Sequence, residues 1–207
     1  MTVRTKICGI TRVADGLACA RQGADAIGLV FYAPSPRHVA IPQALEIARA
    51  LPPFVTTVAL FVDPPVDEVE AVLHSVRPDV LQFHGDESAE FCRRFGVPYL
   101  KAVRVQAGLN LVEYAGRYRD AQGLLLDAYV EGQAGGTGLC FDWALIPADL
   151  PLPVILSGGL EPGNVEAAIR QVKPWAVDVS SGVEARKGIK DTTKIAAFMQ
   201  GVRNATL

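Results

Sequence analysis

The sequence predicts a single-domain α/β fold, a (β/α)8 TIM barrel, on the strength of three observations. Short apolar runs alternate with amphipathic stretches along the chain, and the runs are almost continuously apolar, as in strands covered on both faces. A strand that is followed by a crossover helix returns parallel to the strand before it. Dividing 207 residues among eight such units gives about 26 residues each, the compact end of this fold. A doubly wound open sheet is the alternative architecture.

The individual elements follow from the spacing of the apolar residues. The predicted strands are 3–8, 26–31, 57–61, 80–83, 99–103, 124–127, 154–156 and 176–179. Apolar residues three and four apart indicate helices between them, about eight in all and clearest over 42–51, 66–76, 87–95, 165–172 and 192–202. Because no linker or block of charge interrupts the pattern, residues 1–207 are expected to form one catalytic domain.

Composition excludes several classes of function. The 20 Lys and Arg residues nearly balance the 22 Asp and Glu residues, so there is no broad positive field to bind nucleic acid or an acidic membrane. No apolar run reaches the roughly 18 residues of a membrane span, and the N-terminus lacks the apolar stretch of a signal peptide. A cytoplasmic protein is therefore expected. Its four cysteines contain no C-x-x-C pair, which argues against a zinc or redox site and for free thiols.

Two residues at predicted strand ends are candidates for acid-base chemistry. In a (β/α)8 barrel the catalytic residues lie at the C-terminal ends of the strands. Cys8 closes the first strand in the stretch KICGI, although a buried cysteine is more often a small apolar filler. Asp127 follows three leucines and precedes a glycine-containing loop, so an N-cap is less favoured than a catalytic role such as that of a general acid.

Glycine-rich segments follow the seventh and eighth strands. They contain Ser157-Gly158-Gly159 and Ser180-Ser181-Gly182, and the first is followed by a helix start. Glycines let a backbone approach a ligand closely, and in these barrels a phosphate site characteristically lies after strands seven and eight. The pair of segments therefore favours a phosphate site over tight turns alone.

For several other residues, both a functional and a structural role are possible. Arg37 lies in a loop stiffened by two prolines, which suits either a carboxylate-binding fork or a surface arginine. His84 is a possible ligand contact, although a histidine near a strand end is more often structural. The loop 135–138 could form a lid. The residues expected to be structural are Cys19, Cys92, Cys140, Trp143 and Trp175.

Taken together, these stretches resemble the phosphoribosylanthranilate isomerase family of tryptophan biosynthesis. Each stretch alone is a weak indication, but their order and spacing over nearly the whole chain are highly specific. They are KICG at 6–9, PSPR at 34–37, QFHG at 82–85, GGTG at 135–138, LSGGL at 156–160 with NV at 164–165, and DVSSGVE at 178–184.

The resemblance implies a cofactor-free and metal-free Amadori rearrangement of N-(5-phosphoribosyl)anthranilate to 1-(2-carboxyphenylamino)-1-deoxyribulose 5-phosphate. Cys8 would be the general base and Asp127 the general acid, while Arg37 would hold the anthranilate carboxylate with His84 nearby. The phosphate would be bound by Gly158, Gly159, Ser180, Ser181 and Gly182, with Asp178 as a supporting polar residue.

Further expectations concern Lys6, Glu184 and the partners of the chain. Lys6, two residues before Cys8 and on the same side of the strand, is expected to lower the pKa of the Cys8 thiol. A role in substrate binding, or plain solvation at the other end of the barrel, is also open for Lys6. Glu184 could merely favour a helix start by its charge. The expected partner is a small phosphorylated substrate, with neither nucleic acid nor membrane, and the chain would be a monomer or a homodimer.

Two alternative functions are open at this point. Another sugar-phosphate barrel, such as a ribulose-phosphate epimerase, would in its metal-dependent form call for several His and Asp ligands, and the chain has 3 histidines. A non-catalytic phosphate-binding protein would need no acid-base pair. The joint presence of Cys8 and Asp127 at strand ends disfavours it.

Overall fold

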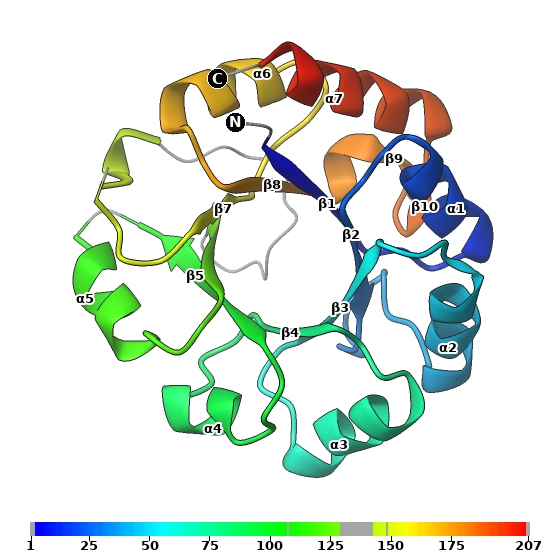
Figure 1. Ribbon diagram of the computed structural model, residues 1–207, viewed down its shortest axis with the longest axis horizontal. Helices are drawn as coiled ribbons and strands as arrows, with labels where there is room; N and C mark the ends of the chain where they lie inside the picture. The colour runs from blue at the N-terminus through cyan, green and yellow to red at the C-terminus, as the bar shows by residue number, and fades with distance from the viewer. Residues whose placement is uncertain (1–2, 107, 129–142, 148, 206–207) are drawn as a thin grey trace.

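The predicted barrel is confirmed. The structure, a computed structural model, describes residues 3–106, 108–128, 143–147 and 149–205. Eight parallel strands close into a barrel in sequential order, with β8 pairing back onto β1 (Figure 1), so the open sheet is excluded. The strands are β1 (Arg4–Cys8), β2 (Ala26–Val30), β3 (Thr56–Phe61), β4 (Val80–Phe83), β5 (Tyr99–Val105), β6 (Gly123–Ala128), β7 (Val154–Leu156) and β8 (Ala176–Val179).

The helices form a ring outside the barrel, as Figure 1 shows. They are α1 (Val13–Arg21), α2 (Ile41–Ala50), α3 (Val66–Ser75), α4 (Ala89–Arg93), α5 (Leu111–Arg117), α6 (Val165–Val172) and α7 (Thr192–Asn204). The expectation of about eight helices is met by seven α-helices in the described residues. Between β6 and β7 the described part of the chain contains a single 3-10 turn, η1 (Trp143–Leu145).

Helix α4 is shorter than the predicted segment 87–95. The Ser88 side chain accepts a hydrogen bond from the backbone N–H of Phe91 at 3.1 Å and so caps the helix after Glu87. The Glu87 carboxylate instead accepts hydrogen bonds from the backbone of Gly85 and from the ammonium of Lys101, at 3.0 Å each. The side chain that begins the helical pattern therefore stabilises the turn after β4.

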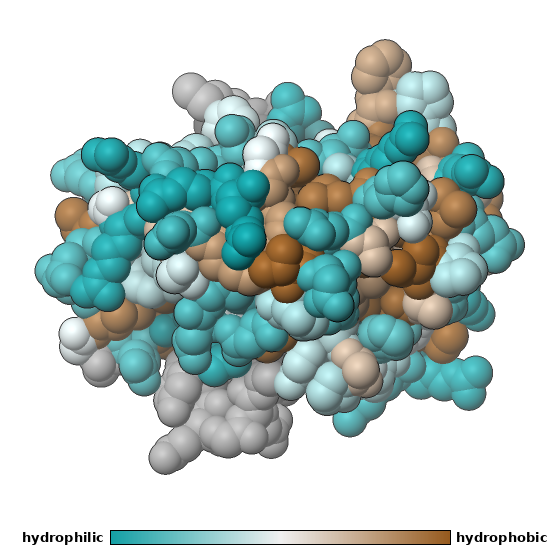
Figure 2. All heavy atoms as spheres, turned by 90° about the horizontal axis from the view of Figure 1, so that it is seen from below, coloured by the Kyte–Doolittle hydropathy of each residue, from teal (hydrophilic) through white to brown (hydrophobic). Residues whose placement is uncertain are grey.

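The hydrophobic core lies between the barrel and the helix ring. Phe31, Phe61 and Phe83 stack in sequence, with ring centroids 5.5 and 6.2 Å apart. Trp143 is partly buried and packs against this core, but Trp175 is 58% exposed, so its predicted packing role is wrong. It lies just before β8, at the N-terminal end of the barrel. On the flank seen in Figure 2, polar and apolar side chains are interspersed.

A small hairpin follows β8 where a helix start was considered. The 3-10 turn η2 (Ser181–Val183) leads into β9 (Glu184–Arg186), which pairs antiparallel with β10 (Ile189–Lys190). Helix α7 begins only at Thr192, where Asp191 accepts hydrogen bonds from two backbone N–H groups. Glu184 therefore does not favour a helix start, and its side chain is available for other contacts.

Candidate active site

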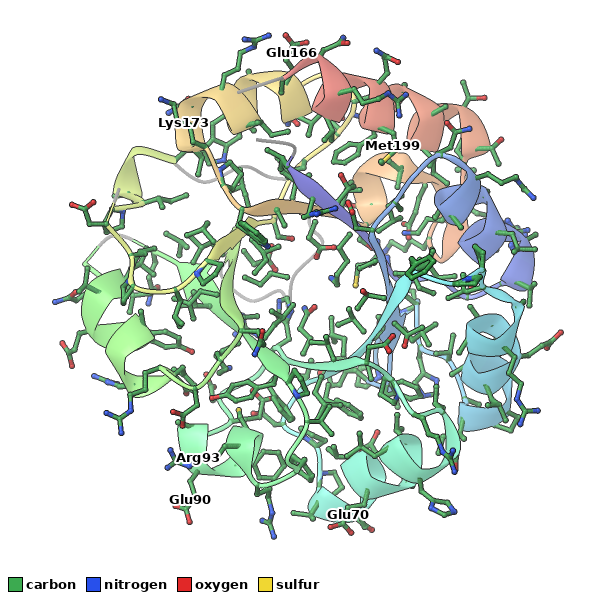
Figure 3. The ribbon with its side chains drawn as sticks, viewed as in Figure 1. Glu70, Glu90, Arg93, Glu166, Lys173 and Met199 are labelled. Atoms are coloured by element: carbon green, nitrogen blue, oxygen red, sulfur yellow. The ribbon has the colours of Figure 1, made fainter. Side chains whose placement is uncertain are left out.

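The predicted site residues gather around one cavity at the C-terminal end of the barrel. Its volume is ≈ 430 Å³, and the predicted residues among its lining are Cys8, Arg37, His84, Asp127, Gly158, Gly159, Asp178, Ser180 and Ser181. Two larger hollows lie at the N-terminal end, beside Val154 and Trp175 and beside Thr57 and Asp79, and contain none of them. The charged side chains labelled in Figure 3, including Glu70 and Glu166, point away from the barrel axis.

Cys8 is buried at the end of β1, with 5% of its surface exposed. Gly28 on the neighbouring strand makes room for the thiol, because a Cβ atom there would lie 2.6 Å from the sulfur. Burial raises the pKa of the Cys8 thiol, and the charge of Lys6 opposes this rise without outweighing it. The direction of the expected Lys6 effect is therefore correct, but the net pKa shift of Cys8 is upward.

Lys6 and Asp178 form a buried ion pair below the cavity. Their Nζ and Oδ1 atoms are 2.8 Å apart, in an oblique contact rather than an aligned hydrogen bond, and both side chains are about 95% buried. Burial alone would lower the pKa of Lys6, yet the Asp178 carboxylate and Cys8 outweigh it and raise the pKa. Lys6 is therefore a permanent positive charge beside the thiol. Ser157 donates a hydrogen bond to the other Asp178 oxygen at 3.4 Å.

Asp127 lies at the end of β6 in contact with His84. The Nε2 atom of His84 is 3.1 Å from Oδ2 of Asp127, and its Nδ1 atom is 2.9 Å from Nε2 of Gln82. When the Gln82 amide donates to Nδ1, the histidine carries its proton on Nε2 and donates to Asp127. His84 is then a hydrogen-bond donor to the carboxyl group of Asp127, the group that would act as the general acid.

Arg37 is held by Glu184. Its Nε and Nη2 atoms donate to the two carboxylate oxygens at 2.7 and 2.9 Å, a bidentate pair. Burial alone would raise the pKa of the Glu184 carboxyl, but the hydrogen bonds from Arg37 and the charge of Lys190 outweigh it and lower the pKa. Glu184, which the sequence suggested only as a possible helix-start charge, is therefore an ionised partner of Arg37, and Arg37 lines the cavity.

The two glycine-rich loops, which follow β7 and β8, both line the cavity. Gly158 and Gly159 line it together with Ser180 and Ser181, whereas Gly182 does not. A Cβ atom at Gly182 would clash with the carbonyl oxygen of Leu160, so this glycine lets the two loops approach each other. Helix α6 begins only at Val165, so any backbone donors for an anion come from the loops rather than from that helix start.

Several residues of the cavity and its support escaped the sequence-based prediction. Arg104 and Lys187 line the cavity, Gln82 contacts His84, and Lys190 contacts Glu184. The predicted fifth strand, 99–103, stops one residue before Arg104, but β5 runs on to Val105. Gln82 and Arg104 are each the last but one residue of a strand, β4 and β5, and could have been identified by position. The contact of Lys190 with Glu184 depends on the hairpin β9–β10, which was not predicted.

The remaining expectations concern thiols, metal sites and the lid. Cys19 and Cys92 are buried free thiols, and burial raises the pKa of each to about 12, as expected for structural cysteines. Within the described ranges, no group of three His, Cys, Asp or Glu side chains could hold a metal ion, and no helix is long and apolar enough to cross a membrane. The predicted lid at 135–138 and Cys140 lie outside the described residues.

The closed barrel and its cavity define a (β/α)8-barrel enzyme with a buried thiol, a histidine-bound carboxylate and two glycine-rich loops at one mouth. Residues 5–201 match the family model described as N-(5'phosphoribosyl)anthranilate (PRA) isomerase, and the chain belongs to this family. The isomerase of this name from Nitrosospira multiformis is 58% identical over 202 residues, which cover 98% of this chain and 97% of that protein.

Solved structures support the same assignment. The phosphoribosyl anthranilate isomerase of Thermotoga maritima superposes with a TM-score of 0.90 at 41% identity, covering 98% of this chain and 99% of the other. A second, in complex with reduced 1-(o-carboxyphenylamino)-1-deoxyribulose 5-phosphate, gives a TM-score of 0.87 at 40% identity, with coverage of 98% and 99%. The resemblance found in the sequence is therefore confirmed, and the chain is a phosphoribosylanthranilate isomerase by family.

Proposed function

We propose that Cys8 and Asp127 carry out the isomerase reaction as general base and general acid, with residues 1–207 acting as one catalytic domain. The reaction converts N-(5-phosphoribosyl)anthranilate to 1-(2-carboxyphenylamino)-1-deoxyribulose 5-phosphate. The observation that carries this proposal is that both side chains line the same cavity, from β1 and β6, beside the two glycine-rich loops. In the same proposal Arg37 holds the anthranilate carboxylate, and the loops with Gly158, Gly159, Ser180 and Ser181 hold the phosphate.

The chemistry needs one proton delivered and one removed. Protonated Asp127 gives its proton to the ring oxygen, the bond from that oxygen to C1 breaks, and the nitrogen lone pair forms an iminium ion at C1. The thiolate of Cys8 then takes the proton from C2. The C–H electron pair forms the C1–C2 double bond while the iminium electrons return to nitrogen, giving an enolamine that tautomerises to the ketone. The products balance as an isomer of the substrate, so no cofactor is consumed.

The neighbours of the two groups suit these roles. The His84 hydrogen bond to Asp127 stabilises the carboxylate that remains after the proton has been delivered. The positive charge of Lys6 favours the Cys8 thiolate, against the burial that raises the pKa of the thiol. We expect the fraction of Cys8 thiolate to grow with pH. A cytoplasmic location belongs to the proposal, because a reducing compartment keeps this cysteine as a free thiol.

The proposal is tested by replacing each group in turn. Substrate is generated in situ and its loss is followed by anthranilate fluorescence, with and without a chelator. Cys8→Ala and Asp127→Asn should each lower kcat by about 10²- to 10⁴-fold, the usual contribution of a general acid or base. Cys92→Ala, which removes another fully buried thiol, is the matched control and should keep kcat within a factor of about two. Near-full activity of Cys8→Ala would refute the assignment of the base.

We further propose that the chain forms a homodimer through the N-terminal end of its barrel. Phe54 is 101% exposed there and follows Pro52 and Pro53, whose backbone angles are restricted. The exposed Trp175 lies at the same end, beside a hollow of ≈ 660 Å³. Large exposed apolar groups that share one face are typical of an interface, and a second copy would cover them while leaving the catalytic end open. One solved structure from Thermotoga maritima is of monomers generated from a phosphoribosylanthranilate isomerase that is described as dimeric.

A further inference from the structure

We infer that Glu184 and Lys190 are positioning residues which fix Arg37 relative to the phosphate loop, and so set the distance between the two anion-binding ends of the substrate site. The inference rests on the proposed role of Arg37 in holding the anthranilate carboxylate. It assigns a task to the hairpin β9–β10, because Glu184 begins β9 and Lys190 ends β10.

Glu184 occupies one edge of the Arg37 guanidinium and leaves the other for a ligand. The Nε and Nη2 atoms donate to Glu184, whereas Nη1 makes no hydrogen bond to any described residue. A guanidinium has five N–H donors in a planar fork, so the edge formed by Nη1 and Nη2 can still take a carboxylate in bidentate geometry. Glu184 thus restrains the group that would bind the substrate without using up its donors.

Lys190 connects this pair to the phosphate loop. Its side chain has no exposed surface, and Nζ lies 3.1 Å from Oε1 of Glu184 and 3.0 Å from the carbonyl oxygen of Ser180. The Ser180 hydroxyl is a further, weaker partner at 3.5 Å. Because a buried ammonium loses its hydration, it holds all of these acceptors closely. The contacts form a continuous chain from Arg37 through Glu184 and Lys190 to Ser180.

The hairpin is itself fixed to the barrel at several points. The backbone N–H of Lys190 donates to Asp15 of α1 at 3.1 Å, and Lys194 of α7 donates to the carbonyl oxygen of Glu184 at 2.8 Å. The stem of Arg37 passes directly over Gly9, where a Cβ atom would lie 2.5 Å from its Cδ. The chain of contacts is thus preorganised, which limits the ordering that binding would otherwise require.

The test compares two ligands that differ only in the carboxylate. The first is reduced 1-(o-carboxyphenylamino)-1-deoxyribulose 5-phosphate, and the second is its phenyl analogue without the carboxyl group. Calorimetry should show that Glu184→Gln weakens binding of the first about tenfold, as expected when a charged bidentate contact is lost, and binding of the second less than twofold. Glu184→Asp should restore part of the loss. Lys190→Gln should weaken both ligands, because Ser180 loses its support as well.

The control and the overturning outcomes are equally specific. Glu166→Gln removes a carboxylate that pairs with Arg170 on the outer face of α6, where Figure 3 shows Glu166 pointing away from the barrel, and should leave both affinities unchanged. Equal weakening of both ligands by Glu184→Gln would make Glu184 merely structural. Tighter binding of the first ligand would mean that Glu184 competes with it for Arg37. Either result overturns the inference.

Failure of the proposed function has a different signature. Binding needs no turnover, so the ligand comparison holds whether or not Cys8 and Asp127 are catalytic. If Arg37→Met leaves the preference for the carboxylate ligand intact, the proposed role of Arg37 is wrong. If Arg37→Met abolishes the preference while Glu184→Gln preserves it, the role of Arg37 stands and the positioning role of Glu184 is overturned. In the Arg37→Met background, Glu184→Gln should change neither affinity by more than about twofold.

Discussion

Aspartate residues have different roles at the two ends of the barrel. At the N-terminal end, Asp79 precedes β4 and accepts hydrogen bonds from the backbone N–H and the hydroxyl of Thr57, both at 2.7 Å. Asp25 likewise accepts one from the backbone of Thr5 at 2.8 Å. At the C-terminal end, Asp127 contacts a histidine and Asp178 a buried lysine, and both line the cavity.

This difference shows how a single barrel separates stability from chemistry. Asp25 and Asp79 link neighbouring strands through backbone N–H groups, whereas Asp127 and Asp178 face a cavity large enough for a ligand. The burial of Lys6, Asp127 and Asp178 at the ligand-facing end is costly unless each charge has a partner. A residue's end of the barrel is therefore a better guide to its role than its chemical type.

Replacing one aspartate at each end of the barrel should give the largest effects. Asp127→Asn should lower kcat by about 10²- to 10⁴-fold with little change in the free energy of unfolding. Asp79→Ala should lower the free energy of unfolding by about 1.5–3 kcal/mol, the contribution of a hydrogen bond to a charged group, and leave kcat/KM unchanged. Urea titration and steady-state kinetics on both variants make the comparison. An Asp79→Ala enzyme that is stable but inactive would contradict the assignment of stability to the N-terminal end and of catalysis to the C-terminal end.

A variant of Phe54 tests the N-terminal end as an interface. Burying a phenylalanine contributes roughly 1.5–3 kcal/mol, and a two-fold interface would contain the residue twice. Phe54→Ser should therefore weaken self-association by about 10²- to 10⁴-fold, measured by sedimentation velocity over a dilution series. Val112→Ser, at a 48% exposed position on α5, is the control and should sediment like the wild type. A wild-type chain that stays monomeric at every concentration would refute the proposed dimer interface.

The smallest effect concerns the charge beside Cys8. Lys6 lowers the pKa of a thiol that burial raises, so Lys6→Met should move the alkylation profile of Cys8 to higher pH. The rate is read by mass spectrometry of the peptide that contains Cys8. Lys6→Arg keeps the charge and should keep the wild-type profile. Lys173→Met, which changes the residue ending α6, serves as a control for loss of a remote charge. An unchanged profile in Lys6→Met would refute the tuning.

Much of the fold could be predicted because a parallel strand covered on both faces needs a run of apolar residues, and each such run is visible in the sequence. The predicted first strand differs from β1 by one residue, and Cys8 and Asp127 lie at strand ends as predicted. The boundaries that moved did so for reasons of tertiary contact. Helix α4 starts late because Glu87 binds the buried Lys101, and a pattern of apolar spacing does not contain that contact.

The parts of the site that escaped prediction are pairings between distant residues. Arg37 and Glu184 are 147 positions apart, and only the closed barrel brings them together. Apolar periodicity locates elements but does not say which charged side chains meet. Apolar character alone is also a poor guide to burial at Trp175. Its position beside a strand suggests that it is buried, but it lies at the end of the barrel and is exposed.

Barrel closure also determines when this enzyme can first work during synthesis. β1 pairs with β2, but its other edge waits for β8, which joins Arg4 to Ala176 in register. Cys8 leaves the ribosome long before the charges that act on it from β8 and β10, those of Asp178 and Lys190. Contacts of such large sequence separation are slow to form. The nascent chain should therefore expose the unpaired edge of β1 until β8 has emerged, and during that time it is most prone to aggregate and most in need of chaperones.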